Sequence, residues 1–428
     1  MQRFPHPDAA QRPGRILAAC LLTAAVVFPA VLGASPIDGN SVTLGFVGDI
    51  MVHKAQLRRA WRGEDSGGRD RGYDFSPSFE WFSLYLQAPD WTMGNLETTF
   101  GGPNSAWIGD EQWAFREYQA YPCFTTPDSL APVLADAGFD LLSTANNHCM
   151  DSNLEGAART LEVLAGAGIP STGTAAGAEP PRPWRGRVGG FDLAVLAWTA
   201  SVNGLVSSRP GMAGINVFNA RGHDDRLQDM LADIRREAAE NHDLLILFIH
   251  WGQEYMDEPD RYQRNLADLA LEAGADIIIG SHPHTLQPVE RRFVDRDGDG
   301  PDPPREAFIA WSLGNFLSSQ SYVEGTREWV DGSAMLNLDI ERGSDGLARV
   351  SAAEMIPLYV QRSSENVRVL AAADGLAPEG AARYGLTDYD LDRLKAYDAW
   401  VPGQMTRYLG ALPARRADAA WRVDFPAP

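Results

Sequence analysis

The sequence predicts an α/β fold in which helices and strands alternate along the chain. Two short, continuous apolar runs, residues 244–249 and 277–279, each follow a stretch with the apolar periodicity of an amphipathic helix. Apolar runs of this kind are typical of strands buried on both faces of a sheet. Stretches rich in strand-forming residues dominate later in the chain, so the order of elements indicates an α/β sandwich.

The individual elements follow from local patterns. Before the first long apolar run, we expect a strand at 41–47 ending at Gly48-Asp49, a helix at 127–137, a strand at 139–143, a helix at 154–167 and a Gly-Gly hairpin at 187–197. Helices at 224–240 and 261–273 should lead into the two apolar strands. A hairpin at 286–294 and 306–313, two strands after Gly332 and C-terminal helices complete the prediction.

Composition and charge limit the classes of function. The 428 residues include 37 Lys and Arg against 57 Asp and Glu, a formal net charge of −20. This is an ordinary globular composition, which excludes wholesale disorder, and a single long apolar run excludes a polytopic membrane protein. The negative field repels phosphate backbones and no basic block is visible, so we expect no nucleic-acid partner.

The N-terminus has the features of a targeting segment. Residues 16–34 are uncharged and mostly apolar, and Arg3, Arg12 and Arg15 precede them. A positive leader before an apolar run directs the following chain out of the cytoplasm. We therefore expect residues 1–34 to be a signal peptide or a retained membrane anchor, residues 41–360 to form the main domain outside the cytoplasm, and residues 361–428 to be a partly helical extension.

Polar residues cluster where predicted strands end. The segments are Gly48-Asp49 with His53, Gly94-Asn95-Leu96-Glu97, residues 144–151, His250 with Glu254, and Gly280-Ser281-His282-Pro283-His284. Five of the eight histidines lie in them. Open α/β sheets place their sites beyond the carboxyl ends of strands, so these groups are expected to converge. Carboxylate and imidazole ligands suit Zn, Mn or Fe. In extended backbone, His282 and His284 would point to one face.

This ordered set of motifs resembles the CapA-type poly-γ-glutamate capsule synthesis family of the calcineurin-like metallophosphatase superfamily. The matching segments are residues 48–51, 94–97, 145–151, 250–255, 280–288 and 312–316, and the resemblance covers residues 42–320. It implies a four-layer α/β/β/α sandwich. It also implies one or two divalent metal ions, held by Asp49, Glu97, Asn147, His250, His282 and His284.

The resemblance implies further roles. His148 falls at the position of a general acid, and we take His148 and Asp151 as candidate catalytic residues. Asn95, Asn146, Glu254 and Asn315 are candidates for substrate binding. Two positions depart from the phosphatase pattern. Met51 replaces a histidine in the first motif, with His53 as an alternative ligand, and Glu97 replaces an aspartate, so the first metal site is expected to be weak or missing.

Three functions fit these residues. The first is biosynthesis, export or processing of an anionic capsule polymer such as poly-γ-glutamate, through a metal centre that activates water. The second is a general extracytoplasmic phosphodiesterase or nucleotidase, and the third is a non-catalytic, polymer-binding scaffold of a membrane synthesis complex. A protein of charge −20 needs local cations to hold a polyanion, and Arg58, Arg59, Arg209, Arg291 and Arg292 are candidates unless they are simply solvated.

Two further features leave alternatives open. Asp295, Asp297, Asp299 and Glu306 fit the pattern of a calcium-binding EF-hand loop, but the flanks look like strands and three prolines interrupt the loop, so a solvated turn is the alternative. Cys123 and Cys149 either pair in an oxidising compartment or remain two buried thiols.

Overall fold

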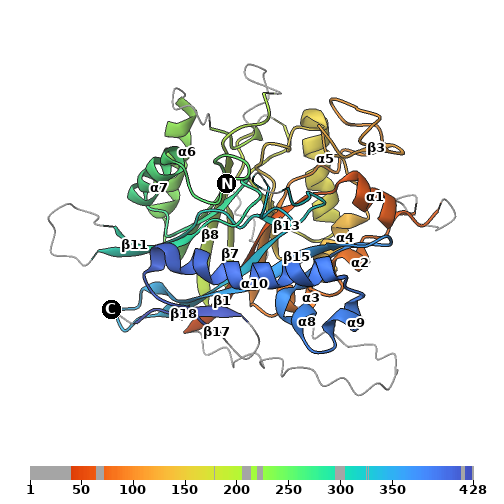
Figure 1. Cartoon of the computed structure of the whole chain (residues 1–428). Coiled ribbons are helices and arrows are strands. Elements are labelled where there is room, and N and C mark those ends of the chain that lie inside the picture. The colour runs from red at the N-terminus through yellow and green to blue at the C-terminus, as the bar shows by residue number, and fades with distance from the viewer. Residues whose placement is uncertain are drawn as a thin grey trace.

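Two β-sheets form the centre of the molecule, with helices on both outer sides (Figure 1). The computed structural model describes residues 40–428 except 64–71, 178, 205–213, 219–224, 295–303, 324, 326, 416–419 and 427–428. The predicted leader, residues 1–34, lies outside the described residues. No helix in the described part of the chain is long and apolar enough to cross a membrane.

The larger sheet has ten strands in the order β17-β18-β15-β14-β1-β2-β5-β6, with β13 beside β1 and β16 beside β15. Its strands are β1 Ser41–Ile50, β2 Trp91–Leu96, β5 Leu141–Ser143, β6 Ser171–Thr172, β13 Asn315–Leu317, β14 Gly332–Arg342, β15 Ala348–Arg362, β16 Val367–Ala371, β17 Ala414–Arg415 and β18 Trp421–Asp424. Strand β1 pairs in parallel with β2 and antiparallel with β14. The central strand therefore joins residues from the two ends of the domain.

The smaller sheet has six strands in the order β11-β12-β10-β9-β8-β7. They are β7 Trp184–Val188, β8 Phe191–Thr199, β9 Leu244–His250, β10 Ile277–Ser281, β11 Val289–Val294 and β12 Arg305–Ala310. Strands β8, β9, β10 and β12 run parallel, so their carboxyl ends lie at one edge. A separate ribbon joins β3 Ala114–Phe115 and β4 Tyr118–Gln119.

Side-chain alternation along the strands builds the layers. In β9, Ile246 and Phe248 pack between the two sheets, whereas Leu245, Leu247 and Ile249 pack under the helices α6 Asp225–Ala238 and α7 Arg261–Ala273. The far face of the ten-stranded sheet is covered by α1 Lys54–Ala60, α2 Ser76–Phe79, α3 Ser83–Gln87, α4 Leu130–Ala137 and α5 Asn153–Gly166. The expected α/β/β/α sandwich is confirmed.

The segment after residue 360 completes this sandwich. Strands β16 and β18 extend the ten-stranded sheet by pairing with β15. Helices α8 Ala372–Leu376 and α9 Gly380–Tyr384 lead into α10 Asp388–Leu409, the long blue helix across the front of Figure 1. Helix α10 contacts β15 of one sheet and β11 of the other. It therefore covers the open side between the two sheets.

Candidate metal centre

The carboxyl ends of strands from both sheets meet at one place, as the motif order predicted. Asp49 lies near the end of β1, and Glu97 directly follows β2. From the other sheet, His250 is the last residue of β9, and His282 and His284 follow β10. The backbone reaches this place only because Gly48 has no side chain, since a Cβ there would lie 1.9 Å from the carbonyl oxygen of Gly314.

Glu97 shows that the site is suited to a cation. Its carboxylate is completely buried, and neither of its oxygens has a hydrogen-bond partner in the described structure. Its Oε1 lies 3.5 Å from Nε2 of His250 and 3.9 Å from Nε2 of His284. Burying a carboxylate without a compensating charge lowers the free energy of unfolding by several kcal/mol. A bound metal ion would remove that cost, so the residues present fit a metal.

Three overlapping groups of side chains could each hold a metal ion. The ligand atoms in each group all lie within 4.8 Å of one another. The first group is Asp49, Glu97 and His284, the second is Glu97, His250 and His282, and the third is Glu254, His282 and His284. Glu97 is shared by the first two groups, which is the position expected of a bridging carboxylate. The individual ligand roles remain predictions.

A hydrogen bond orients the ring of His250. Its Nδ1 lies 2.8 Å from Oγ of Ser281, and its Nε2 lies 3.0 Å from Oδ1 of Asn147. A partner on one ring nitrogen directs the other nitrogen toward a metal. Our sequence analysis missed Ser281, although the parallel register pairs it directly with His250.

The two histidines after β10 do not lie in extended backbone, so that expectation was wrong. Strand β10 ends at Ser281, and His282 and His284 both have positive φ angles, +97° and +58°. Non-glycine residues in this region are strained and concentrate at functional sites. Both rings still reach the centre. Nδ1 of His284 lies 3.2 Å from Oδ2 of Asp49 and 3.1 Å from Oδ1 of Asn315.

Three asparagines predicted to bind substrate are fully buried among the metal-site residues. Nδ2 of Asn95 donates to Oδ1 of Asp49 over 2.8 Å, and Nδ2 of Asn146 donates to Oδ1 of Asn95 over 3.1 Å. Asn315 instead uses its oxygen, since its Oδ1 lies 3.1 Å from Nδ1 of His284. Their burial fits the positioning of ligand side chains better than contact with a substrate. Glu254, the fourth predicted residue, is exposed at the rim.

His148 and Asp151 form a pair beside the ligand groups. Nδ1 of His148 lies 2.7 Å from Oδ2 of Asp151, which also accepts from the backbone N–H of Phe124 over 2.5 Å. Burial raises the pKa of Asp151, while the attraction of His148 lowers it. The carboxylate favours a proton on Nδ1 and leaves Nε2 as the nitrogen available for proton transfer.

Electrostatics prepare the histidines to act as ligands. Burial, followed by the charge of His282, holds the pKa of His250 well below its ordinary value. Burial likewise lowers the pKa of His282 to about 4. Neutral imidazole is the form that binds metals. Burial and the nearby charge of Asp49 raise the pKa of Glu97 well above its usual range, so metal and proton compete for this carboxylate.

The first motif departs from the phosphatase pattern in structure as well. Met51 is buried and carries a thioether in place of an imidazole or a carboxylate, the ligands that suit Mn, Zn or Fe. His53 belongs to none of the three ligand groups found among the described residues, and its Nδ1 accepts from the backbone N–H of Ser319 over 3.2 Å. His53 directly precedes helix α1, and its backbone N–H donates to Oε1 of Gln56 over 2.7 Å.

One cation at the rim was not recognised from the sequence. The guanidinium of Arg327 lies 4.4 Å from the ring centroid of Tyr255, and that ring lies 6.1 Å from the ring of His284. Arg327 is exposed and makes no ion pair within the described part of the chain. The sequence holds no motif around Arg327, so only the fold reveals its proximity to the centre.

The remaining sequence predictions lie away from the centre. Asp295, Asp297 and Asp299 lie outside the described residues, while Glu306 in β12 accepts two hydrogen bonds from Arg291. Arg292 is also paired, with Glu290 and Asp268, and Arg209 is not described. Cys123 and Cys149 are two buried free thiols, the second of the two alternatives.

Together, the two packed sheets, the outer helices and the carboxylate–imidazole cluster define a metallophosphatase-like sandwich with a candidate metal centre. Comparison with known families then identifies the group within that class. The chain belongs to the family described as bacterial capsule synthesis protein PGA_cap, whose model matches residues 43–320.

Individual proteins resemble the chain over most of its length. It is 27% identical to the PGA biosynthesis protein CapA of Bacillus subtilis over 76% of this chain and 75% of that protein. It is 25% identical to the capsule biosynthesis protein CapA of Bacillus anthracis over 81% of this chain and 75% of that protein. A crystal structure of a hypothetical protein from Thermus thermophilus aligns with a TM-score of 0.36 and 16% identity, over 72% of this chain and 96% of that one.

Proposed function

We propose that this protein is a metal-dependent hydrolase or transferase that acts outside the cytoplasm on an anionic capsule polymer of the poly-γ-glutamate type. The buried Glu97 carboxylate carries the proposal, because its two unpartnered oxygens lie between imidazoles contributed by the other sheet. The substrate class comes from the family and from the CapA relatives, which are described as acting in PGA or capsule biosynthesis. The expected location comes from the N-terminal sequence pattern.

The ligand set divides between the two sheets. Asp49, Glu97 and His284 would hold one ion, and Glu97, His250, His282 and the amide oxygen of Asn147 would hold the other. Bound divalent ions of this kind supply Lewis-acid polarisation of a carbonyl or phosphoryl group and lower the pKa of bound water. Carboxylate and imidazole donors fit Mn, Zn or Fe.

His148 supplies the proton in this proposal. Asp151 holds the Nδ1 side of the ring, so Nε2 is the nitrogen that can give a proton to the leaving group. In γ-glutamyl hydrolysis or transfer, the leaving group is an amine that must be protonated as the amide bond breaks. Asp151 stabilises the protonated ring before this transfer and orients it throughout.

The rim adds a means of binding an anionic substrate. Arg327 is held over Tyr255, next to His284, with its guanidinium exposed. A guanidinium binds a carboxylate or phosphate through two parallel hydrogen bonds. Arg327 is therefore placed to hold one charged group of the chain while a neighbouring bond lies over the centre.

The test is turnover by purified protein loaded with Mn, Zn or Fe, measured against the chelated protein. Poly-γ-glutamate and a short γ-glutamyl peptide are followed by size-exclusion chromatography and by release of free amine. We expect metal-dependent cleavage or transfer that is lost in His250→Ala and reduced at least a hundredfold in His148→Ala. Cleavage of a generic phosphodiester alone would indicate a phosphodiesterase, and binding without any turnover would indicate a scaffold. Either result would overturn the proposal.

A further inference from the structure

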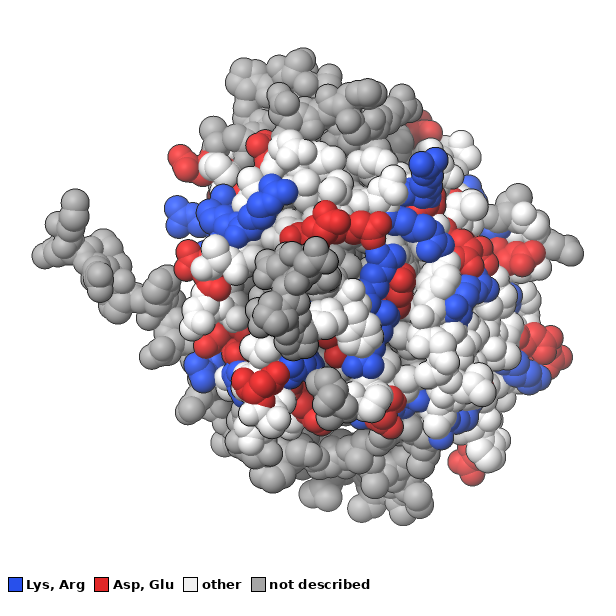
Figure 2. Space-filling model, turned by 90° about the vertical axis from the view of Figure 1, so that its left-hand side faces the viewer, with Lys and Arg blue, Asp and Glu red and all other residues white. Residues whose placement is uncertain are grey.

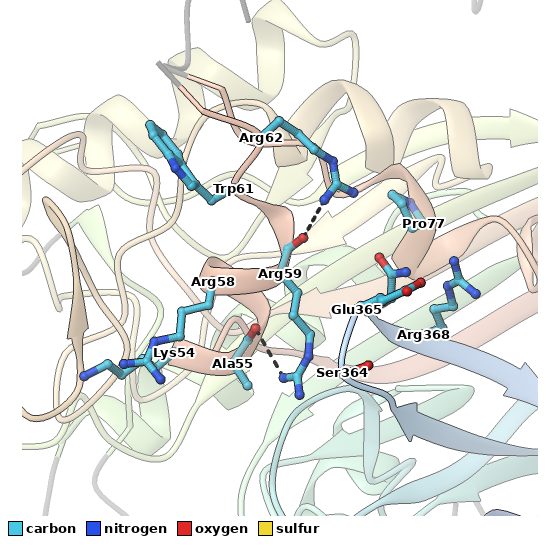
Figure 3. Close-up of a pocket in the computed structure, with 11 residues that line it drawn as sticks. Lys54, Ala55, Arg58, Arg59, Trp61, Arg62, Pro77, Ser364, Glu365 and Arg368 are labelled. Carbon is cyan, nitrogen blue, oxygen red and sulfur yellow. Dashed lines mark hydrogen bonds between the residues drawn. The ribbon is translucent and has the colours of Figure 1, made fainter. Parts of the chain in front are cut away.

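A strongly basic cavity is lined by helix α1, which follows the strand β1 that carries Asp49. It has a volume of about 900 Å³ and is open to solvent, between α1 with the residues just after it and the turn that joins β15 to β16. Its charged lining consists of five cations and one acid: Lys54, Arg58, Arg59, Arg62, Arg368 and Glu365. We call it the α1 cation pocket (Figure 3).

This charge is unusual for the molecule, which has 57 acidic residues and 37 basic ones. On the face shown in Figure 2, which bears β11, positive and negative side chains are interspersed. Arg291 and Arg292 of β11 are both paired with carboxylates. The α1 cation pocket instead gathers five cations around one acid, in contrast to the net negative charge of the chain.

Several of the cations lack carboxylate partners. Arg58 is exposed and forms no ion pair with any described residue. Arg59 donates only a long hydrogen bond, 3.4 Å, to the carbonyl oxygen of Ala55, and its buried Nε has no partner within the described structure. Arg62 lies 3.5 Å from Asp74, and both of these side chains are substantially exposed. In Figure 3, the side chains of Arg59 on α1 and of Arg62 just after α1 extend toward the side of the pocket that carries Glu365 and Arg368.

Aromatic rings hold cations in and beside the pocket. The guanidinium of Arg368 lies 4.2 Å from the ring centroid of Trp81, and its buried Nε is unpartnered in the described structure. The guanidinium of Arg116 lies 3.8 Å from the ring centroid of Trp61, which lines the pocket. Cation–π contacts hold a guanidinium in place without neutralising it. Arg368 is thus positioned at the pocket wall while its charge stays available to a ligand.

Short connections join the pocket to the metal centre. Lys54 follows Asp49 by five residues, a reach of at most about 18 Å in extended chain. Arg362, at the end of β15, donates to the carbonyl oxygen of Ser319, whose N–H donates to His53 just before α1. The turn that lines the pocket begins directly after Arg362. A chain of repeated negative charges could therefore occupy the pocket while another part of it lies at the centre.

We infer that the α1 cation pocket is a polymer-binding subsite that takes successive carboxylates of a polyanionic chain, separately from the metal centre. Carboxylates fit because guanidinium groups pair with them in a planar, two-point fashion, and repeated carboxylates match several spaced guanidiniums. The inference takes its ligand class from the proposed function. It differs in needing no metal, because none of the pocket residues belongs to the three ligand groups.

The test is the affinity of the full-length protein for fluorescently labelled poly-γ-glutamate, measured by anisotropy with chelator present. We expect Arg58→Gln/Arg59→Gln to weaken binding about tenfold, as for the loss of two charge-assisted contacts, and to reduce its salt dependence. The matched control is Arg235→Gln/Arg236→Gln, two exposed neighbouring arginines in the last turn of α6. The control removes the same charge and should change affinity less than twofold. Arg368→Gln tests the opposite wall without altering α1.

Equal losses in the control and pocket variants would show a non-specific charge effect and overturn the inference. So would tighter binding of polyphosphate than of poly-γ-glutamate of equal charge, which would assign the pocket to phosphates. Glu97→Gln separates the two proposals. Binding retained in Glu97→Gln but lost in the pocket variant supports the subsite whether or not turnover is found. Binding lost in Glu97→Gln and retained in the pocket variant rejects the subsite while leaving the proposed catalytic centre intact.

Discussion

At the scale of single residues, Glu97 combines a high electrostatic cost with a position shared by two of the ligand groups. A carboxylate with no hydrogen-bond partner, next to Asp49 and inside a buried cluster, destabilises the metal-free protein. The same carboxylate contacts histidines that lie on the other sheet. The proposed ligand role would offset this cost whenever a metal ion is bound.

We predict that Glu97→Gln lowers the metal content of the purified protein by an order of magnitude or more and does not lower the melting temperature of the metal-free form. Glutamine keeps the size of the side chain and removes its charge. Metal analysis after dialysis and thermal melting measure the two effects. Glu254→Gln, an exposed carboxylate from the third ligand group, is the control and should lose less metal. A full metal content in Glu97→Gln would contradict the bridging assignment.

Acid sensitivity can also be assigned to a single side chain. Burial, followed by the charge of His284, lowers the pKa of His53 to about 3 from its ordinary 6.5. As the pH falls below 6.5, His53 binds a proton in the unfolded chain, whereas in the folded chain it stays neutral until about pH 3. The free energy of unfolding therefore keeps the full contribution of the neutral His53 ring above pH 6.5. Below pH 6.5 it falls by at most about 1.4 kcal/mol per pH unit.

We predict that the free energy of unfolding of His53→Asn falls less steeply than that of the wild type between pH 6.5 and 4. Urea unfolding of the metal-free protein at a series of pH values measures it, and the difference between the slopes of variant and wild type isolates the one residue. Parallel slopes would show that His53 is protonated equally in both states.

Among the elements, α10 depends on one buried carboxylate at its contact with β14. Asp331 precedes β14 and accepts hydrogen bonds from Arg393 and from the hydroxyl of Tyr397, both on α10, over 2.9 Å each. Removing this carboxylate would leave the hydroxyl of Tyr397 without its acceptor and would leave the Arg393 guanidinium with the carbonyl oxygen of Glu328 but no carboxylate, in largely buried surroundings. Breaking a buried pair in this way costs about 3–5 kcal/mol.

We expect Asp331→Ala to lower the free energy of unfolding by that amount in urea titrations. Asp392→Ala, on the exposed face of the same helix, removes only a surface contact with Lys395 and should cost about 0.5 kcal/mol or less. Similar losses of unfolding free energy in the two variants would mean that the contacts of Asp331 do not stabilise the packing of α10.

The elements that sequence patterns predicted well are those with a strong apolar period. Helix α7 was predicted at its observed bounds, and β9 and β10 were each correct but short by one or two residues at the carboxyl end. The basic helix α1 was not predicted, because its seven residues show little apolar period. Strand β2 was also missed, since residues 91–93 are too few to show an alternation before the Gly-Asn-Leu-Glu motif.

The candidate site was predictable to the level of which segments meet. Polar residues placed directly after apolar strands converge because parallel strands end together. The backbone at His282 and His284, the hydrogen bond of Ser281 and the proximity of Arg327 depend on contacts between segments far apart in sequence. No local pattern encodes such contacts.

For the whole molecule, the ligand set links the two sheets. Asp49 lies in the ten-stranded sheet and Glu97 directly follows its strand β2, whereas His250 ends β9 of the six-stranded sheet and His282 and His284 follow β10. A metal ion binding here would stabilise the packing between the sheets as well as the site. At a free concentration a hundred times the dissociation constant, one such ion contributes about 2.7 kcal/mol.

We predict that chelation lowers the melting temperature and increases hydrogen exchange together in β1, β9 and β10, while α8 and α9 stay unchanged. Hydrogen-exchange mass spectrometry with and without added Mn or Zn measures this. An increase confined to one sheet would show that the ligand set does not join both.

The pairing of β1 with β14 has a consequence for how this protein is made. Ser41 lies opposite Glu341, and the N–H of Asp49 donates to the carbonyl oxygen of Gly314. One side of β1 can pair with β2 early in synthesis, whereas its other side must wait for residues translated about 265 to 300 positions later. Contacts over such separations form slowly and leave early segments exposed. The side of β1 that stays unpaired would therefore benefit from a holding chaperone during synthesis.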